Sequence, residues 1–190
     1  MKRIGLIIIV IACLFACKTK TEKNSTSSAA KVSNFKIEKG EDFIKVFRQD
    51  ESSALVTQNV KSDFRPFMHP IMAPDSEVEL TQYSPGHHPH QTGLYWGFTR
   101  VNGTGAEPEE LKKWFYDKNK PEDIQQKIGR DFFHNPGSDH WQRVSIQILI
   151  AEGAEVKWQS VYNMLDANKK PILKETQIWT FKEKEGKHLL

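Results

Sequence analysis

The sequence has almost no cysteine. Of its 190 residues only Cys13 and Cys17 are cysteines, and both lie close to the N-terminus. The rest of the chain therefore cannot form an internal disulfide, and its core must be stable without one. Long apolar runs are also missing after Cys17, where no stretch approaches the roughly 20 residues that a membrane-spanning helix needs. This excludes a protein that crosses the membrane several times.

Charge of one sign is not concentrated anywhere in the chain. The formal net charge is +3, and the lysines are spread along the sequence. A nucleic-acid-binding face would normally appear as a basic cluster, so we predict no nucleic-acid partner. The sequence has no glycine-rich phosphate loop and no internal repeat. Its length predicts a single domain.

The N-terminus has the pattern of a bacterial lipoprotein signal. A basic Met1–Arg3 precedes an apolar run, Ile4–Ala16, whose thirteen residues have the length of a signal-peptide core. The run ends in Leu-Phe-Ala-Cys, which resembles the lipobox of exported lipoproteins. We therefore expect the Cys17 thiol to be acylated. A plain secretory signal with incidental cysteines is the alternative.

These features predict three regions. Residues 1–17 would be the signal peptide, residues 18–34 a polar tether rich in Lys, Thr and Ser, and residues 35–190 the folded domain. The mature protein would be anchored by lipid in the bacterial cell envelope, at the periplasm or the outer membrane.

The folded part is predicted to be mainly β. Several short segments have strand composition: Phe43–Arg48, Ala54–Val60, Val78–Tyr83 and Leu94–Val101. The first two read as a hairpin, and the prolines of Arg65–Pro70 favour an edge strand or a bend. Proline and acids at Pro108–Glu110 mark a helix start inside a helical insertion over residues 106–129, with a second short turn at Glu122–Ile128.

The C-terminal third gives the clearest pattern. Three extended runs, Gln142–Ala151, Glu155–Met164 and Ile172–Lys182, are separated by short turns. The first of them alternates apolar residues at Val144, Ile146, Ile148 and Ile150. Core bulk is expected from the following residues: Trp158, Val161, Tyr162, Ile178 and Trp179. We predict an antiparallel β-sandwich.

The candidate site is the stretch Ser84–Gly97, which contains three histidines among prolines and glycines. Six of the seven histidines lie between His69 and His140, and imidazole is the side chain best suited to proton transfer or metal binding near neutral pH. Acid–base chemistry on a sugar would use His69, His88 and His90 as catalytic groups. Glu175 or Asp139 would be the carboxylate. The aromatic residues that could stack on a sugar ring are Tyr95, Trp96 and Trp141.

Two other interpretations stay open. In the first, His88 and His90 share a face of an extended segment and bind a metal with a further ligand. The candidates for that ligand are His69, His134, Asp139 and His140. In the second, the protein is a non-catalytic lipoprotein in which Arg65 forms an ion pair or caps backbone groups. The sequence identifies no cofactor.

Several motifs together resemble a family of bacterial proteins known as PmoA, or methane oxygenase. They are Arg65-Pro66-Phe67-x-His69-Pro70, Pro85–Leu94 (Pro-Gly-His-His-Pro-His-Gln-Thr-Gly-Leu), Val101-Asn102-Gly103 and Asp131-Phe132. Family members typically read Asp-His-Pro-His-His-Arg-Gly-Leu at the second motif. Here His87, Gln91 and Thr92 replace three of those residues, whereas His88 and His90 are retained.

The resemblance covers roughly Phe43 to Lys182, the N-terminal half or more of the family's domain, and so implies a shortened domain. It implies an exported β-sandwich similar to galactose-mutarotase-like, sugar-processing domains, not a methane monooxygenase. A carbohydrate or another small molecule would bind in a histidine-rich cleft. Arg65, Trp96 and Glu175 would contact it beside the catalytic histidines.

Overall fold

A computed structural model describes residues 34–74, 78–105, 107–116 and 127–190. The predicted signal peptide with Cys17, and all but the last residue of the tether, lie outside these ranges. None of the described helices is long and apolar enough to cross a membrane.

The described chain is mainly β and has two antiparallel sheets. The first sheet has the order β4-β3-β2-β1-β6 and the second the order β5-β7-β8-β9. The strands of the first sheet are β1 (Phe35–Lys39), β2 (Phe43–Arg48), β3 (Ala54–Asn59), β4 (Phe67–Ile71) and β6 (Glu152–Gly153). Those of the second are β5 (Trp141–Ile150), β7 (Glu155–Leu165), β8 (Pro171–Lys184) and β9 (Lys187–Leu189). The predicted hairpin is β2 and β3. As expected, β4, which follows Pro66 and contains Pro70, lies at a sheet edge.

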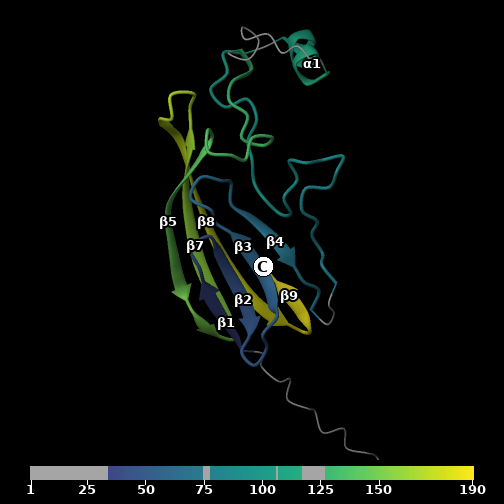
Figure 1. Cartoon of the computed structure of the whole chain (residues 1–190), viewed down its shortest axis with the longest axis vertical. Coiled ribbons are helices and arrows are strands. Elements are labelled where there is room, and N and C mark those ends of the chain that lie inside the picture. Colours follow the sequence, from purple (N-terminus) through teal and green to yellow (C-terminus); the bar gives the residue numbers. More distant parts are fainter. Residues whose placement is uncertain (1–33, 75–77, 106, 117–126) are drawn as a thin grey trace, which may run out of the picture. The chain divides into compact units, whose positions relative to one another are not determined.

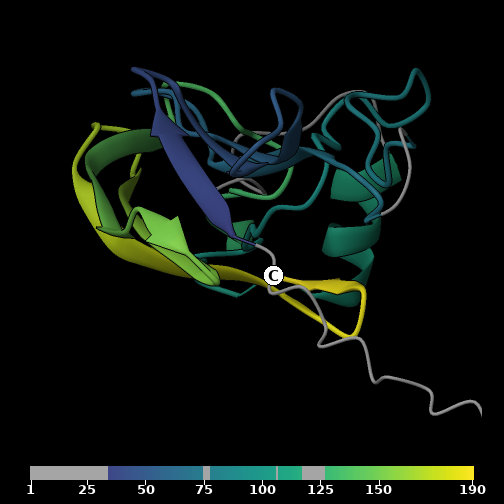
Figure 2. The ribbon, with the colours of Figure 1, turned by 90° about the horizontal axis from the view of Figure 1, so that it is seen from below.

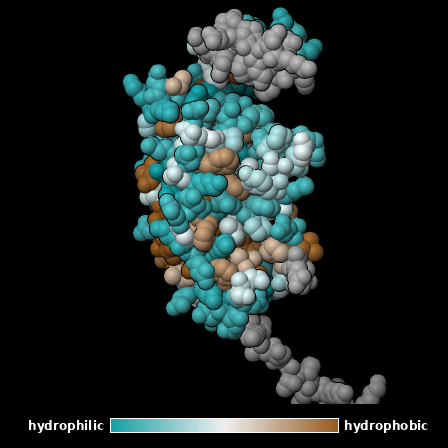
Figure 3. All heavy atoms as spheres, in the orientation of Figure 1, coloured by the Kyte–Doolittle hydropathy of each residue, from teal (hydrophilic) through white to brown (hydrophobic). Residues whose placement is uncertain are grey.

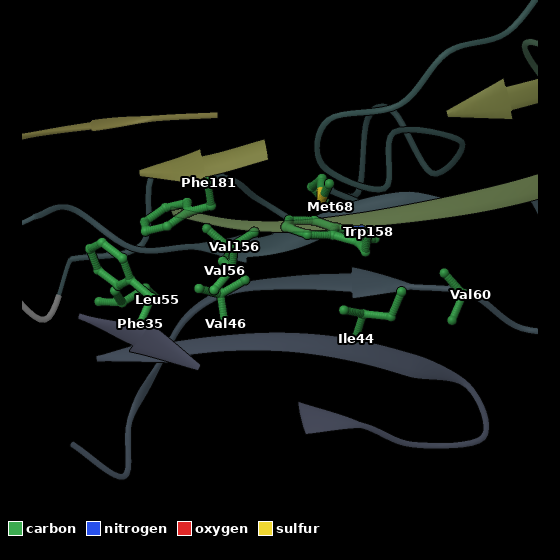
Figure 4. Packing of buried hydrophobic residues seen from close by; sticks show 10 residues of the cluster. All are labelled: Phe35, Ile44, Val46, Leu55, Val56, Val60, Met68, Val156, Trp158 and Phe181. Atoms are coloured by element: carbon green, nitrogen blue, oxygen red, sulfur yellow. The ribbon is translucent and has the colours of Figure 1, made fainter. Parts of the chain in front are cut away.

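The two sheets pack face to face and form a sandwich (Figures 1 and 2). One apolar cluster contains residues of both sheets, including Phe35, Ile44 and Val56 from the first and Trp158 and Phe181 from the second. These side chains meet between the layers (Figure 4). The alternating apolar residues of β2, Ile44 and Val46, are fully buried there. The predicted antiparallel sandwich is confirmed.

A polar group lies inside this interior and is satisfied within it. The Gln58 amide donates to Ser160 Oγ (3.1 Å) and to Gln177 Oε1 (3.0 Å), and its Oε1 accepts from Trp158 Nε1 (2.7 Å). Gln58 and Ser160 are fully buried. Because Gln58 lies on β3, Trp158 and Ser160 on β7 and Gln177 on β8, this network fixes the position of β3 against β7 and β8.

A second cluster supports the loops at one end of the sandwich. It consists of the buried residues Phe132, Trp141, Tyr162 and Met164. Trp141 Nε1 donates to Asn135 O at 2.9 Å, which ties the 131–137 loop to the start of β5. The loop is therefore held by buried packing and not only by its own turns.

Two bulges in β5 change the predicted alternation. The β5–β7 register shifts between Arg143 and Ser145 and again between Ile148 and Ile150. Each bulge adds a residue and turns the following side chains to the other face. Ile146 and Ile148 therefore pack on the core, whereas Val144 and Ile150 are exposed.

Several apolar residues of the second sheet are exposed on its outer face. Leu149 is 40% exposed, and Ile178, predicted to be core, is 56% exposed because it pairs with Gln159 on the outer face of β8. In the space-filling view, apolar residues gather along the margin where β5 lies, while the rest of the visible face is mostly hydrophilic (Figure 3).

Two predicted strands are wrong. Among the residues that the structure describes, Val78–Tyr83 and Leu94–Val101 form only isolated bridges, such as Met72 with Glu79 and Met68 with Leu94. Neither segment has a continuous strand partner there, so a β-like composition does not place it in a sheet. The predicted helix start is confirmed, since α1 (Pro108–Tyr116) carries Glu109 and Glu110 in its first turn. Most of the second predicted turn, Glu122–Ile128, lies outside the described residues.

Candidate functional site

The histidine stretch is a closed loop after β4. Tyr83 bridges Thr92 across its base, and Ser84 N donates to Gln91 O at 2.6 Å. Inside it, His88 N donates to Pro85 O (2.7 Å), Gln91 N donates to His88 O (3.0 Å), and Ser84 Oγ donates to Pro89 O (2.9 Å). These bonds hold the loop in one non-repetitive path, as the prolines and glycines predict.

Four imidazoles form a row of ring contacts at this surface. The ring centroids are 4.7 Å apart for His87 and His88, 5.8 Å for His88 and His90, and 4.7 Å for His90 and His134. His90 also contacts the ring of Phe133 at 5.6 Å. The fold thus brings the rings of His88 and His90 into contact, through a loop with turns and not the extended segment that the metal hypothesis assumes, and adds His134 from a loop more than 40 residues further along the chain.

The carboxylate of the site is Asp131. Its Oδ2 lies 2.7 Å from His134 Nδ1, and its Oδ1 accepts from the backbone N–H groups of Phe133 (2.9 Å) and His134 (3.0 Å). The turn therefore fixes the carboxylate, and the carboxylate fixes one nitrogen and the orientation of the imidazole. The other ring nitrogen, Nε2, remains available on a side chain that is 41% exposed.

Arg65 holds the loop of His90 and the loop of His134 together from the interior of the protein. It is fully buried, and its terminal nitrogens donate to Phe133 O (2.5 Å), His90 O (2.8 Å) and Thr92 Oγ1 (3.3 Å). The guanidinium also lies over the Tyr95 ring, 3.4 Å from its centroid. Carbonyls from both loops thus converge on one planar donor, an arrangement that suits arginine better than lysine.

Burial and charge explain the protonation of the site. Burial lowers the pKa of Arg65 to about 10, while Tyr95, Asp131 and Glu175 favour its charged form, so it remains a cation at neutral pH. The pKa of His90 is lowered, first by burial and then by His134, His88 and Arg65. His90 is therefore a neutral imidazole at pH 7 and can accept a proton.

The other predicted site residues are dispersed. His69 binds Thr81 Oγ1 through Nδ1 (3.0 Å) and contacts the Tyr83 ring, apart from the imidazole row. Trp96 is 58% exposed on the segment that follows the loop. Glu175 faces the interior from β8, and its Oε2 has no hydrogen-bond partner within the described chain. Burial raises the pKa of this carboxyl.

Three further candidates lie outside the row. Trp141 is a core residue with 1% exposure. Asp139 points to solvent near Lys169. His140 contacts Phe132, and burial lowers its pKa to about 4. Over the ranges that the structure covers, no group of three or more His, Cys, Asp or Glu side chains is arranged to hold a metal ion.

The comparison with protein families bears on this region directly. A family of unknown function, DUF6807, matches residues 47–190. The chain belongs to this family. The DUF6807 match includes Arg65, the histidine loop, Asp131 and His134. No curated protein and no solved structure matches the chain.

From the sequence, Asp131 is named in a motif and His134 as a possible metal ligand, but the pair that they form is not predicted. The available signal was their spacing of three in a turn-rich Asp-Phe-Phe-His-Asn-Pro-Gly segment, which suits an aspartate that caps backbone N–H groups. Nothing local in the sequence connects this turn with His90. That connection depends on Arg65.

Proposed function

We propose that this protein transfers protons on a carbohydrate, with His134 and His90 as the reacting groups and Asp131 as the carboxylate that orients His134. The observation that carries the proposal is the 2.7 Å contact between His134 Nδ1 and Asp131 Oδ2. The ring centroid of His90 lies 4.7 Å from that of His134. A carboxylate that orients an imidazole, next to a second imidazole held neutral, is an arrangement suited to general acid–base catalysis.

The reaction class that fits is opening and closing of a sugar ring at its anomeric carbon. Neutral His90 accepts the proton of the anomeric hydroxyl. His134, oriented through Nδ1 by Asp131, presents Nε2 to the ring oxygen and donates a proton to it. The bond between the anomeric carbon and the ring oxygen breaks as the carbonyl forms, and the reverse steps close the ring on either face. No net oxidation occurs.

The sequence motifs shared with the PmoA family support a sugar as substrate, because they imply a mutarotase-like domain and not a methane monooxygenase. Arg65 places His90 and His134 side by side in this scheme. Trp96 offers an exposed aromatic face on the segment that follows the histidine loop, and the charge of Glu175 favours the charged form of Arg65.

Anomer exchange measured by NMR tests the proposal. The full-length chain is incubated with a panel of aldoses, and exchange is compared with that of D131N, H134Q and H90Q. We expect acceleration for at least one sugar, a loss of 100-fold or more in H134Q and H90Q, and a smaller loss in D131N. H87Q is the matched control, since the exposed His87 contacts only His88 in the row. Unchanged exchange in H134Q and H90Q would refute the assignment.

We also propose that the protein is a lipoprotein of the bacterial envelope, anchored through Cys17. The basic Met1–Arg3, the short apolar run and the Leu-Phe-Ala-Cys sequence support this. Labelling of cells with an alkyne-bearing palmitate checks it. The wild-type chain should take up label and fractionate with membranes, whereas C17S should do neither. Equal labelling of both chains would contradict the anchor.

A further inference from the structure

The segment after the histidine loop presents a row of exposed apolar side chains. Leu94, Trp96 and Phe98 are 40%, 58% and 52% exposed, whereas Tyr95 and Gly97 between them are partly buried. The backbone runs from Tyr95 to Phe98 without a turn or bend. In extended chain, alternate residues share a face, so the three exposed side chains form one line about 13 Å long. We call them the apolar row.

The apolar row is held in place by contacts on its inner side. Leu94 exchanges backbone hydrogen bonds with Met68, and Phe98 O accepts from Phe132 N at 2.7 Å. Tyr95 stacks under Arg65. At Gly97 the chain approaches the 132–133 backbone so closely that a Cβ atom would lie 2.7 Å from Phe133 Cα. The row is thus a fixed surface whose exposure does not result from a frayed end.

This exposure is unexplained by the fold itself. Trp96 makes no hydrogen bond and no ring contact within the part of the chain that the structure describes. Exposed apolar side chains gathered on one rigid segment mark a binding surface. The inner side of the segment rests on Phe133, whose neighbour in the chain is His134, so the segment that carries the apolar row packs against the loop that carries His134.

We propose that the apolar row binds successive sugar rings of an oligosaccharide or polysaccharide chain, whose end is presented to His90 and His134. This inference rests on the proposed function and extends it, because it makes the substrate a chain and not a free monosaccharide. A line of about 13 Å is longer than one sugar ring. Aromatic side chains can cover the apolar faces of the rings, and the free indole N–H of Trp96 can donate to a hydroxyl.

The size of the row argues against a protein partner. Three side chains, of which about half is exposed, offer on the order of 300 Å². A stable protein–protein contact needs about 800 Å² on each partner. A narrow, uncharged line of this size suits a linear glycan better.

The test measures binding against chain length. The probes are ladders from mono- to hexasaccharide of glucose, xylose, mannose and galactose, titrated into the full-length chain. Isothermal titration calorimetry is the readout, because it needs no tryptophan reporter and therefore measures the wild type, W96A and W96F in the same way. For one ladder, affinity should rise from one to three or four rings. W96A and F98A should each lower the affinity for the longer saccharides by about 3- to 10-fold, and W96F should retain most of the affinity.

Each outcome decides something. Equal affinity for mono- and hexasaccharides, with anomer exchange intact, overturns the apolar-row inference and leaves the proposed function standing. If no saccharide binds or reacts, both fall. If W96A instead abolishes dimerisation or binding to phosphatidylglycerol vesicles, the row serves another partner and the inference is wrong. Thermal melting of W96A, expected to match the wild type, shows that the variant is folded.

Discussion

Replacing Arg65 with methionine tests whether this residue organises the site or only fills space. Methionine keeps much of the apolar volume but removes every donor. Arg65 is fully buried, and its loss leaves three acceptors without their donor: His90 O, Thr92 Oγ1 and Phe133 O. Each buried polar group deprived of its partner costs about 1–3 kcal/mol.

The net cost follows from opposing contributions. Loss of the stack on Tyr95 adds about 1–2 kcal/mol, since the guanidinium lies 3.4 Å from the ring centroid in a largely dry position. Removing a buried charge returns part of its desolvation energy. We expect R65M to lower the free energy of unfolding by about 3–5 kcal/mol. R65K should lose a similar amount, because a single ammonium cannot reach carbonyls of both loops in the geometry of a planar fork.

Urea unfolding of the full-length chain at pH 7, followed by far-UV circular dichroism, measures these values. R100M is the matched control, since Arg100 is exposed and should change stability by less than about 0.5 kcal/mol. Amide hydrogen exchange adds a local readout. Protection at residues 90–92 and 132–134 should fall more than protection at Ile44 or Trp158. If the stabilities of R65M and R65K lie within about 1 kcal/mol of the wild type, Arg65 does not hold the two loops together as argued.

Other predictions concern the interior and its pH dependence. Gln58→Leu should destabilise by about 2–4 kcal/mol in urea unfolding, because it strands Trp158 Nε1 and Ser160; a neutral change would contradict the network. Gly97→Ala should cost about 1–3 kcal/mol by melting, since its Cβ meets Phe133. Burial lowers the pKa of His140 from about 6.5 in the unfolded chain to about 4 in the folded protein. Because the unfolded chain then binds a proton more readily, the free energy of unfolding should fall as the pH drops from 6.5 to 4, by about 1–2 kcal/mol after allowing for exposure. H140Q should flatten that profile.

Local pattern predicted the elements whose partners are adjacent in sequence. β2 and β3 form a hairpin, and α1 begins at Pro108 with acids in its first turn, so their signals lie within a few residues of one another. The long β7 and β8 follow the same rule. β5 departs from the prediction because it contains two bulges. The bulges depend on the register with β7 and cannot be recognised from the alternation of apolar and polar residues in β5 itself.

Leu94–Val101 shows a different kind of limit. Its alternation is real, since Tyr95 and Gly97 turn inward and Trp96 and Phe98 outward. Its inner side packs on Arg65 and the 132–133 backbone, so the pattern reports burial against a loop and not pairing in a sheet. Period-two alternation identifies the buried face but not the partner.

The same reasoning explains why the histidines could be nominated from sequence while their arrangement could not. His88 and His90 are neighbours in the chain, so their proximity follows from local geometry. His134 joins them because Arg65 binds a carbonyl in each loop. In the proposed reaction Arg65 acts by positioning the two loops, Asp131 acts by orienting His134 through Nδ1, and His134 contacts the reacting proton. Variants should separate the two effects: R65K should reduce stability and anomer exchange together, and H134Q should abolish exchange in a chain that melts as the wild type does. A positioning role for Arg65 and a catalytic role for His134 can therefore be told apart only if stability and anomer exchange are measured on the same variants.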